Sequence, residues 1–103
     1  MSKFYNVTGS TGITVELVKP TEDVDIKFMS LANIHATADA TVSLFIQDDP
    51  TSGTTSTYKI ISTVAIPSDT SLFLDDPAMF KFDDDFGLYI TVGSSDTVDI
   101  IIN

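Results

Sequence analysis

The sequence predicts an all-β protein, built as a single antiparallel β-sandwich of seven to eight short strands with a jelly-roll-like arrangement. Apolar and polar residues alternate with a period of two in run after run, which is the pattern of half-buried strands. Turn-forming residues separate these runs at roughly regular intervals, as in sandwiches and related all-β folds. Ser and Thr supply most of the polar bulk, which favours strands over helices.

The length of the chain limits it to one domain. A chain of 103 residues with 43% hydrophobic content can build one core and has no room for a second. No linker, repeat or low-complexity tract divides the sequence. We therefore expect a single domain over residues 1–103, with flexible first residues and flexible loop tips.

The N-terminal part of the chain contains two predicted strands. The inward row of the first consists of Ile13, Val15 and Leu17, and turn residues follow it at Lys19-Pro20-Thr21. The second run keeps one phase over a long stretch, so that it needs a bend or a bulge. Its inward row consists of Val24, Ile26, Phe28, Ser30, Ala32 and Ile34.

The remaining strands follow a turn near Thr37-Ala38-Asp39. The first of them runs from Thr41 to Gln47 with Val42, Leu44 and Ile46 inward, and the segment 48–53 after it is the clearest loop. The later inward rows are Tyr58, Ile60, Val64 and Ile66; Leu72 and Leu74; the short pair Phe80 and Phe82; Leu88, Ile90 and Val92; and Val98, Ile100 and Ile102.

A second set of apolar residues lies out of phase with these inward rows. The set consists of Val18, Met29, Leu31, Phe45, Ile61, Phe73, Tyr89 and Ile101. Scattered exposed apolar residues are ordinary on proteins, and that is one interpretation. If several of them gather on one sheet, they form an apolar patch that a soluble monomer seldom leaves open, which predicts a homo-oligomer or a docking surface.

Charge and composition argue against two classes of partner. The chain carries 15 acidic and 5 basic residues, a net charge of -10, and it has no arginine, the usual reader of phosphates and base edges. We therefore expect no nucleic-acid binding. The start of the chain lacks a basic segment leading into an apolar run, and no stretch approaches the length of a membrane span, so we expect a soluble protein with neither an export signal nor membrane insertion.

The sequence offers little site chemistry. There is no cysteine and the only histidine is His35, which we interpret as an incidental strand or turn residue. Acidic clusters at Asp48-Asp49, Asp75-Asp76 and 83–85 could converge on a hard cation, but they lack the spacing of a calcium loop, and we expect solvated or turn-forming carboxylates. No catalytic residue, metal or cofactor is predicted, and the chain is expected not to be an enzyme.

The cadence of the last seventy or so residues resembles that of small virion structural proteins of tailed bacteriophages, in particular those of marine, cyanophage-like viruses. The resemblance lies in the order of five segments and not in invariant residues. The segments are 40–46 (ATVSLFI), 58–61 (YKII), 64–72 (VAIPSDTSL), 87–92 (GLYITV) and 94–100 (SSDTVDI). The chain departs from the family pattern at Asp69-Thr70, where a Gly usually precedes the Ser-Leu strand.

This resemblance implies a β-sandwich virion component of the tail, baseplate, fibre or capsid surface, often trimeric and without enzymatic activity. It implies a homo-oligomer, with a trimer favoured, that docks to other virion proteins and is assembled in the host cytoplasm. The residues expected at its contacts are Phe45, Ile61, Phe73 and Tyr89, together with Met29 and Leu31.

A carbohydrate-binding sandwich is the alternative interpretation. Such a module would recognise host glycans through Tyr5, Tyr58 or Tyr89 and through Asp or Asn residues in loops. The absence of tryptophan and the presence of only three tyrosines count against it.

Overall fold

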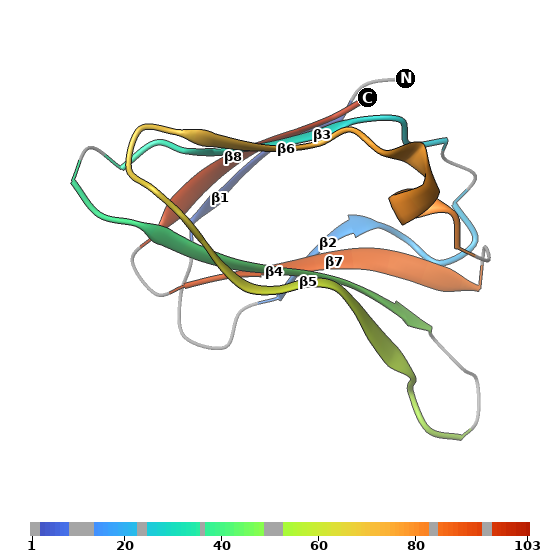
Figure 1. The fold of residues 1–103 in the computed structure, drawn as a ribbon. Helices are drawn as coiled ribbons and strands as arrows, with labels where there is room; N and C mark the ends of the chain where they lie inside the picture. The colour runs from blue at the N-terminus through green and yellow to red at the C-terminus, as the bar shows by residue number, and fades with distance from the viewer. Residues whose placement is uncertain are drawn as a thin grey trace.

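The computed structural model describes residues 3–8, 14–22, 25–35, 37–48, 53–82, 85–93 and 96–103. Within them, two four-stranded antiparallel sheets pack against each other, as Figure 1 shows. In the first sheet, sheet A, the order is β1 (Lys3–Thr8), β8 (Thr97–Ile102), β3 (Met29–Asn33) and β6 (Ser71–Leu74). In the second, sheet B, it is β2 (Thr14–Val18), β7 (Phe86–Val92), β4 (Ala40–Asp48) and β5 (Thr57–Ile66). The prediction of an all-β sandwich is confirmed.

The strands pair in a nested order. Each of the first four strands pairs with one from the second half of the chain: β1 with β8, β2 with β7, β3 with β6 and β4 with β5. Two further pairings, β8 with β3 and β7 with β4, complete the two sheets. Both ends of the described chain therefore lie together in sheet A (Figure 1), and Lys3–Thr8, expected to belong to a flexible start, forms a paired strand.

One cluster of buried apolar side chains fills the space between the sheets. It contains the predicted inward residues of β7 and β8 together with Val42 and Leu44 of β4, whereas the predicted Ile46 is half-buried and packs against it. Among the described residues, no buried side-chain nitrogen or oxygen lacks a hydrogen-bond partner. No helix in the described part of the chain is both long and apolar enough to cross a membrane. The predicted inward residues Ile13 and Val24 lie outside the described residues.

A β-bulge just before β3 reverses the phase that the sequence predicts for this strand. The backbone N–H groups of Lys27 and Phe28 both donate to the carbonyl oxygen of Asn103, at 2.9 and 3.0 Å, so two residues stand opposite one. Beyond this point Met29 and Leu31 face the core and are completely buried. Their expected place on the outer face was wrong, because the bulge that the long run requires comes before them.

A second bulge changes the assignment of Val18. Glu16 stands opposite Tyr89 and Val18 opposite Leu88, so that β2 uses two residues where β7 uses one. Both Leu17 and Val18 are therefore buried, and Val18 is not an outer residue. Gly87 makes this approach possible, since a Cβ atom there would lie 2.7 Å from the Val18 carbonyl oxygen.

The register of β5 also shifts, which moves Ile61 toward the core. Val42 pairs with Val64 and Leu44 with Ile61, so β5 advances three residues where β4 advances two. Thr63 adopts a positive φ of 54° in this shift, and its N–H donates to Ser43 Oγ at 2.9 Å. Ile61 is half-buried and packs against the core, which corrects its expected place on the outer face.

A short 3₁₀ helix (η1) at Pro77–Phe80 replaces the predicted strand pair Phe80 and Phe82. Asp76 caps this helix by accepting a hydrogen bond from the Ala78 N–H at 3.0 Å, and Pro77 supplies a fixed φ at its start. Phe80 still reaches the core, as expected, but it does so from a helical turn that lies between the sheets at one end of the sandwich (Figure 1).

An ion pair ties the start of β1 to the turn after β2. Lys3 Nζ donates to Glu22 Oε2, and Glu22 Oε1 accepts from the Lys19 N–H at 3.1 Å. The hydrogen bond from Lys3, followed by that from Lys19, holds the pKa of Glu22 below its usual value.

The pH dependence of stability follows from this lowered pKa. Because the folded chain holds Glu22 ionised more readily than the unfolded chain, the stabilisation is present above the unfolded pKa and is lost as pH falls through the folded one. We expect the unfolding free energy of the native chain to fall further between about pH 5 and pH 3 than that of Glu22→Gln, which keeps the acceptor for Lys19 but not the charge. Urea midpoints measured across this range test it, and parallel curves would contradict it.

Candidate interaction surface

The six residues predicted at contacts do not lie on one surface. Met29 and Leu31 are in the core, and Ile61 packs against it. Phe45 and Tyr89 lie on the outer face of sheet B, and Phe73 lies on the outer face of sheet A. Of the six, only Phe73 is widely exposed, at 60% of its surface.

On sheet B, the outer apolar residues are covered by their neighbours in the chain. The register places Glu16, Tyr89, Phe45 and Lys59 side by side on β2, β7, β4 and β5. The rings of Phe45 and Tyr89 stack with centroids 5.9 Å apart, and Lys59 Nζ lies 4.6 Å from the centre of the Phe45 ring. The Tyr89 hydroxyl donates to Glu16 Oε2 at 3.2 Å. This row leaves Phe45 only 6% exposed.

Replacing Phe45 by Ser is therefore expected to lower stability and not to weaken association. The substitution removes the stacking partner of Tyr89 and the ring under Lys59, and we expect a loss of about 2 kcal/mol or more of unfolding free energy. Urea denaturation followed by circular dichroism measures the loss, and light scattering measures the oligomeric state. Full stability combined with a lower oligomer mass would contradict this assignment.

On sheet A, the outer apolar residues remain open. The register places four residues side by side across the whole sheet, one on each of β1, β8, β3 and β6. We call them the open row, and they are Phe4, Ile101, Ser30 and Phe73. Phe4 is 71% exposed and Ile101 42%, whereas Ser30 lies low between Ile101 and Phe73 and is 8% exposed. The open row is the largest group of exposed apolar side chains that the described residues place on one sheet face.

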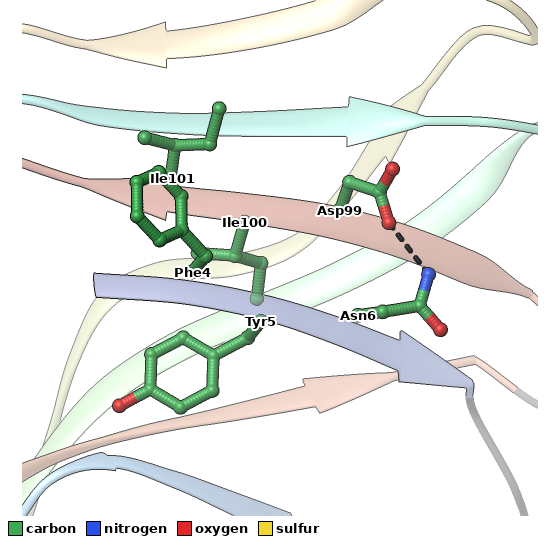
Figure 2. A pocket seen from close by; sticks show the side chains of 6 residues that line it. All are labelled: Phe4, Tyr5, Asn6, Asp99, Ile100 and Ile101. Atoms are coloured by element: carbon green, nitrogen blue, oxygen red, sulfur yellow. Dashed lines mark hydrogen bonds between the residues drawn. The ribbon is translucent and has the colours of Figure 1, made fainter. Parts of the chain in front are cut away.

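A hollow of about 350 Å³ opens beside the open row at the β1 edge of sheet A. Figure 2 shows Phe4 next to Ile101 on one side of it and the hydrogen-bonded pair Asn6 and Asp99 on the other. Asn6 Nδ2 donates to Asp99 Oδ1 at 2.5 Å. The hollow thus combines an exposed aromatic ring with a carboxylate and an amide.

The outer face of sheet A carries little charge. Ten described residues of its strands point outward: Phe4, Asn6, Thr8, Ser30, Ala32, Ser71, Phe73, Thr97, Asp99 and Ile101. Asp99 is the only ionisable one among these ten, and it accepts the bond from Asn6. In a chain with a net charge of -10, this face is nearly neutral.

Two residues of the acidic clusters, Asp48 and Asp76, accept hydrogen bonds from backbone N–H groups. Asp48 Oδ1 accepts from the Ser56 N–H at 2.6 Å, and Asp76 caps η1. Asp49 and residues 83–84 lie outside the described residues. No three His, Cys, Asp or Glu side chains in the described ranges are grouped as ligands for a metal ion.

The single histidine, His35, stabilises a turn by accepting hydrogen bonds from the backbone. His35 Nδ1 accepts hydrogen bonds from the N–H groups of Thr37 and Ala38, each at 3.1 Å. A ring nitrogen that accepts must be unprotonated, so this geometry places any proton on the other ring nitrogen. His35 thus has a structural role in the connection between β3 and β4.

The three tyrosines named for glycan recognition differ in their availability. The Tyr5 hydroxyl donates to the Leu17 carbonyl oxygen at 2.6 Å, and that of Tyr89 is bonded to Glu16. Tyr58 is 59% exposed, and its ring centre lies 5.9 Å from that of Phe86. The most exposed aromatic residue is instead Phe4, which lies in the segment predicted from the sequence to be a flexible start.

The chain was compared with family models, with curated proteins and with solved structures, and none of the three comparisons gives a match.

Proposed function

We propose that the chain is a non-enzymatic structural protein of a bacteriophage virion, which acts by self-association and by docking to other virion proteins. The observation that carries the proposal is the open row on the outer face of sheet A. Exposed apolar side chains gathered on one face typically mark a protein–protein contact. The sequence resemblance to phage structural proteins supplies the virion context.

The strand order supports a jelly roll, which is the finer form of the fold in this proposal. The nested pairing of β1 with β8, β2 with β7, β3 with β6 and β4 with β5 describes a long two-stranded ribbon. Rolling this ribbon brings β8 beside β3 and β7 beside β4, which gives the two observed sheets. Jelly rolls of this kind are common in viral capsid proteins and in lectins.

The distribution of charge supports contact between like copies. Copies that each carry a net charge of -10 repel one another, and the repulsion is strongest where acidic side chains would face each other. The outer face of sheet A offers a nearly neutral surface, with Asp99 already hydrogen-bonded to Asn6. A homo-oligomer could form through this face at moderate salt, where charges elsewhere are screened.

Two measurements test this function. Mass spectrometry of purified particles of the phage that encodes the chain should find it at a constant stoichiometry to the other virion proteins. Light scattering of the purified chain should show an oligomer, and its mass will decide whether the trimer implied by the resemblance is correct. Absence from particles together with a strict monomer at high concentration would overturn the proposal.

A carbohydrate-binding module is the second candidate, and the hollow beside Phe4 is the observation that favours it. An exposed aromatic ring can stack on the apolar face of a sugar, while Asn6 and Asp99 can bond its hydroxyl groups. A glycan array tests this function. Hits that Asn6→Ala abolishes and that Phe73→Ser leaves intact would support the sugar site, because Phe73 does not line the hollow.

A further inference from the structure

The open row has a shape that can pair with a second copy of itself. Large side chains stand at its two ends, Phe4 on the edge strand β1 and Phe73 on the edge strand β6. Between them the row is uneven, because Ile101 projects from β8 while Ser30 on β3 is low and 8% exposed. The row therefore has a projection, Ile101, on one side of its midpoint and a depression, at Ser30, on the other side.

We propose that two copies of the chain pair face to face through sheet A about a twofold axis that runs parallel to the strands between β8 and β3. This inference rests on the proposed function and names the partner as a second copy. The axis exchanges the two ends of the row, so that Phe4 of each copy lies against Phe73 of the other. It also brings each Ile101 over the other copy's Ser30. Such an interface is isologous, with every contact made twice.

The low charge on the outer face of sheet A favours a second copy of the chain over a basic partner protein. Among the ten described outward residues of sheet A, Asp99 is the only one with an acidic side chain, and it is already hydrogen-bonded to Asn6. About the proposed axis, each Asp99 faces the other copy's Ala32 and is displaced sideways from the other Asp99 by one strand spacing, about 4.8 Å. The pairing therefore buries mainly apolar surface, and each Asp99 keeps the hydrogen bond from Asn6 of its own copy.

The aromatic end at Phe73 is ordered before association. Phe28 stacks on Phe73 with ring centroids 5.8 Å apart, and the bulge at Lys27 and Phe28 fixes the position of that neighbour. A side chain already held in place loses less conformational entropy when a partner covers it. Phe73 is thus preorganised as a contact residue.

The loss of Phe73 should weaken this association strongly. Since each pair contains the contact twice, we expect Phe73→Ser to raise the dimer dissociation constant about 1,000-fold, as for two hot-spot residues. Tyr58→Ser is the matched control, because Tyr58 is exposed to the same extent but lies on β5 of sheet B. Sedimentation equilibrium over a concentration series measures both variants.

Cross-linking tests the geometry of the pair without removing the apolar residues. In the row next to the open row, Asn6 and Ser71 occupy the two edge strands, and the axis places Asn6 of one copy opposite Ser71 of the other. The chain has no cysteine, so Asn6→Cys and Ser71→Cys each carry a single thiol. A short bismaleimide added to a mixture of the two variants should link unlike chains, since facing sheets lie about 10 Å apart. Like chains should not be linked, because their thiols would also be displaced sideways by about three strand spacings, or 14 Å.

The outcomes separate this inference from the proposed function. The control is a mixture of Thr14→Cys and Thr57→Cys, which are exposed positions on the two edge strands of sheet B. The pairing is supported if the Asn6→Cys and Ser71→Cys mixture gives many more links between unlike chains than this control does. A trimer, or a dimer in which only like chains are linked, overturns the twofold pairing but leaves a self-associating virion protein. A strict monomer overturns the pairing, and the analysis of particles then decides the proposed function by itself.

Discussion

Replacing Leu44 by Asp should unfold the chain. Leu44 lies in the middle of β4, between β5 and β7, and is completely buried in the core between the two sheets. An unpaired carboxylate at such a position costs about 5 kcal/mol or more, which approaches or exceeds the whole stability of a domain of this size. Far-ultraviolet circular dichroism should show loss of the β spectrum without denaturant.

A matched control separates this effect from the added charge. Thr57→Asp adds the same charge to the neighbouring strand β5, but Thr57 is exposed. This variant should remain folded, with a change in unfolding free energy of about 0.5 kcal/mol or less. A folded Leu44→Asp with native-like cooperativity would contradict the placement of the core.

The alternation that predicts Leu44 as a core residue explains why the fold class could be inferred from sequence. In β7 and β8 the predicted residues at every second position are buried, and in β4 the predicted Val42 and Leu44 are buried together with the outward Ser43 and Phe45. These three strands lie in the interior of their sheets, where partners on both sides hold the register. The period-two pattern predicts burial well in these strands, whereas β3, which is also an interior strand, shows that a bulge can reverse the phase even there.

The positions of the bulges could not be predicted because long-range pairing sets them. Phe28, Met29 and Leu31 supply apolar residues to both phases, so the sequence fits either face of the sheet. The Asn103 carbonyl oxygen decides between them by accepting two successive N–H groups. That pairing joins segments more than seventy residues apart, and no local pattern reports it.

The open row could not be predicted from the sequence for a related reason. Phe4, Ile101 and Phe73 come from the two ends of the chain and from a strand between them, and only the strand order makes them neighbours. Ile101 and Phe73 were identified because they alternate out of phase with the inward rows. For Phe4, the sequence signal was its alternation with Tyr5 and Val7, which is the pattern of a first strand.

The two outer faces show that apolar residues out of phase with the core have two different uses. Phe45 and Tyr89 pack against each other beneath Lys59, so they stabilise the fold of the chain itself. Phe4 and Phe73 stand at opposite edges of sheet A and are too far apart to cover each other, about three strand spacings or 14 Å. Only the second arrangement leaves apolar surface for a partner, which is why Phe73 is the only one of the six predicted contact residues that the proposed contact keeps.

Replacing Asn33 by Ala should destabilise the chain by about 2 to 4 kcal/mol. Asn33 is 2% exposed, and its side-chain amide donates to the carbonyl oxygens of Ala38 and Ile66, each at 2.9 Å. Its Oδ1 accepts from the His35 N–H at 2.9 Å. Ile66 ends β5 in sheet B whereas Asn33 ends β3 in sheet A, so this one side chain joins the two sheets at one end of the sandwich.

The size of the effect follows from the groups left behind. The alanine variant removes three hydrogen bonds and leaves backbone groups without partners at a buried position, which costs more than the bonds themselves contribute. Asn6→Ala is the control, because Asn6 is exposed and bonds only Asp99 in the described structure; it should change the unfolding free energy by about 0.5 kcal/mol or less. Asn33→Asp should be at least as harmful as Asn33→Ala, since it turns a carboxylate oxygen toward two carbonyl oxygens. Urea denaturation of the three variants decides the matter: equal midpoints for Asn33→Ala and Asn6→Ala would show that the buried amide does not hold the sheets together.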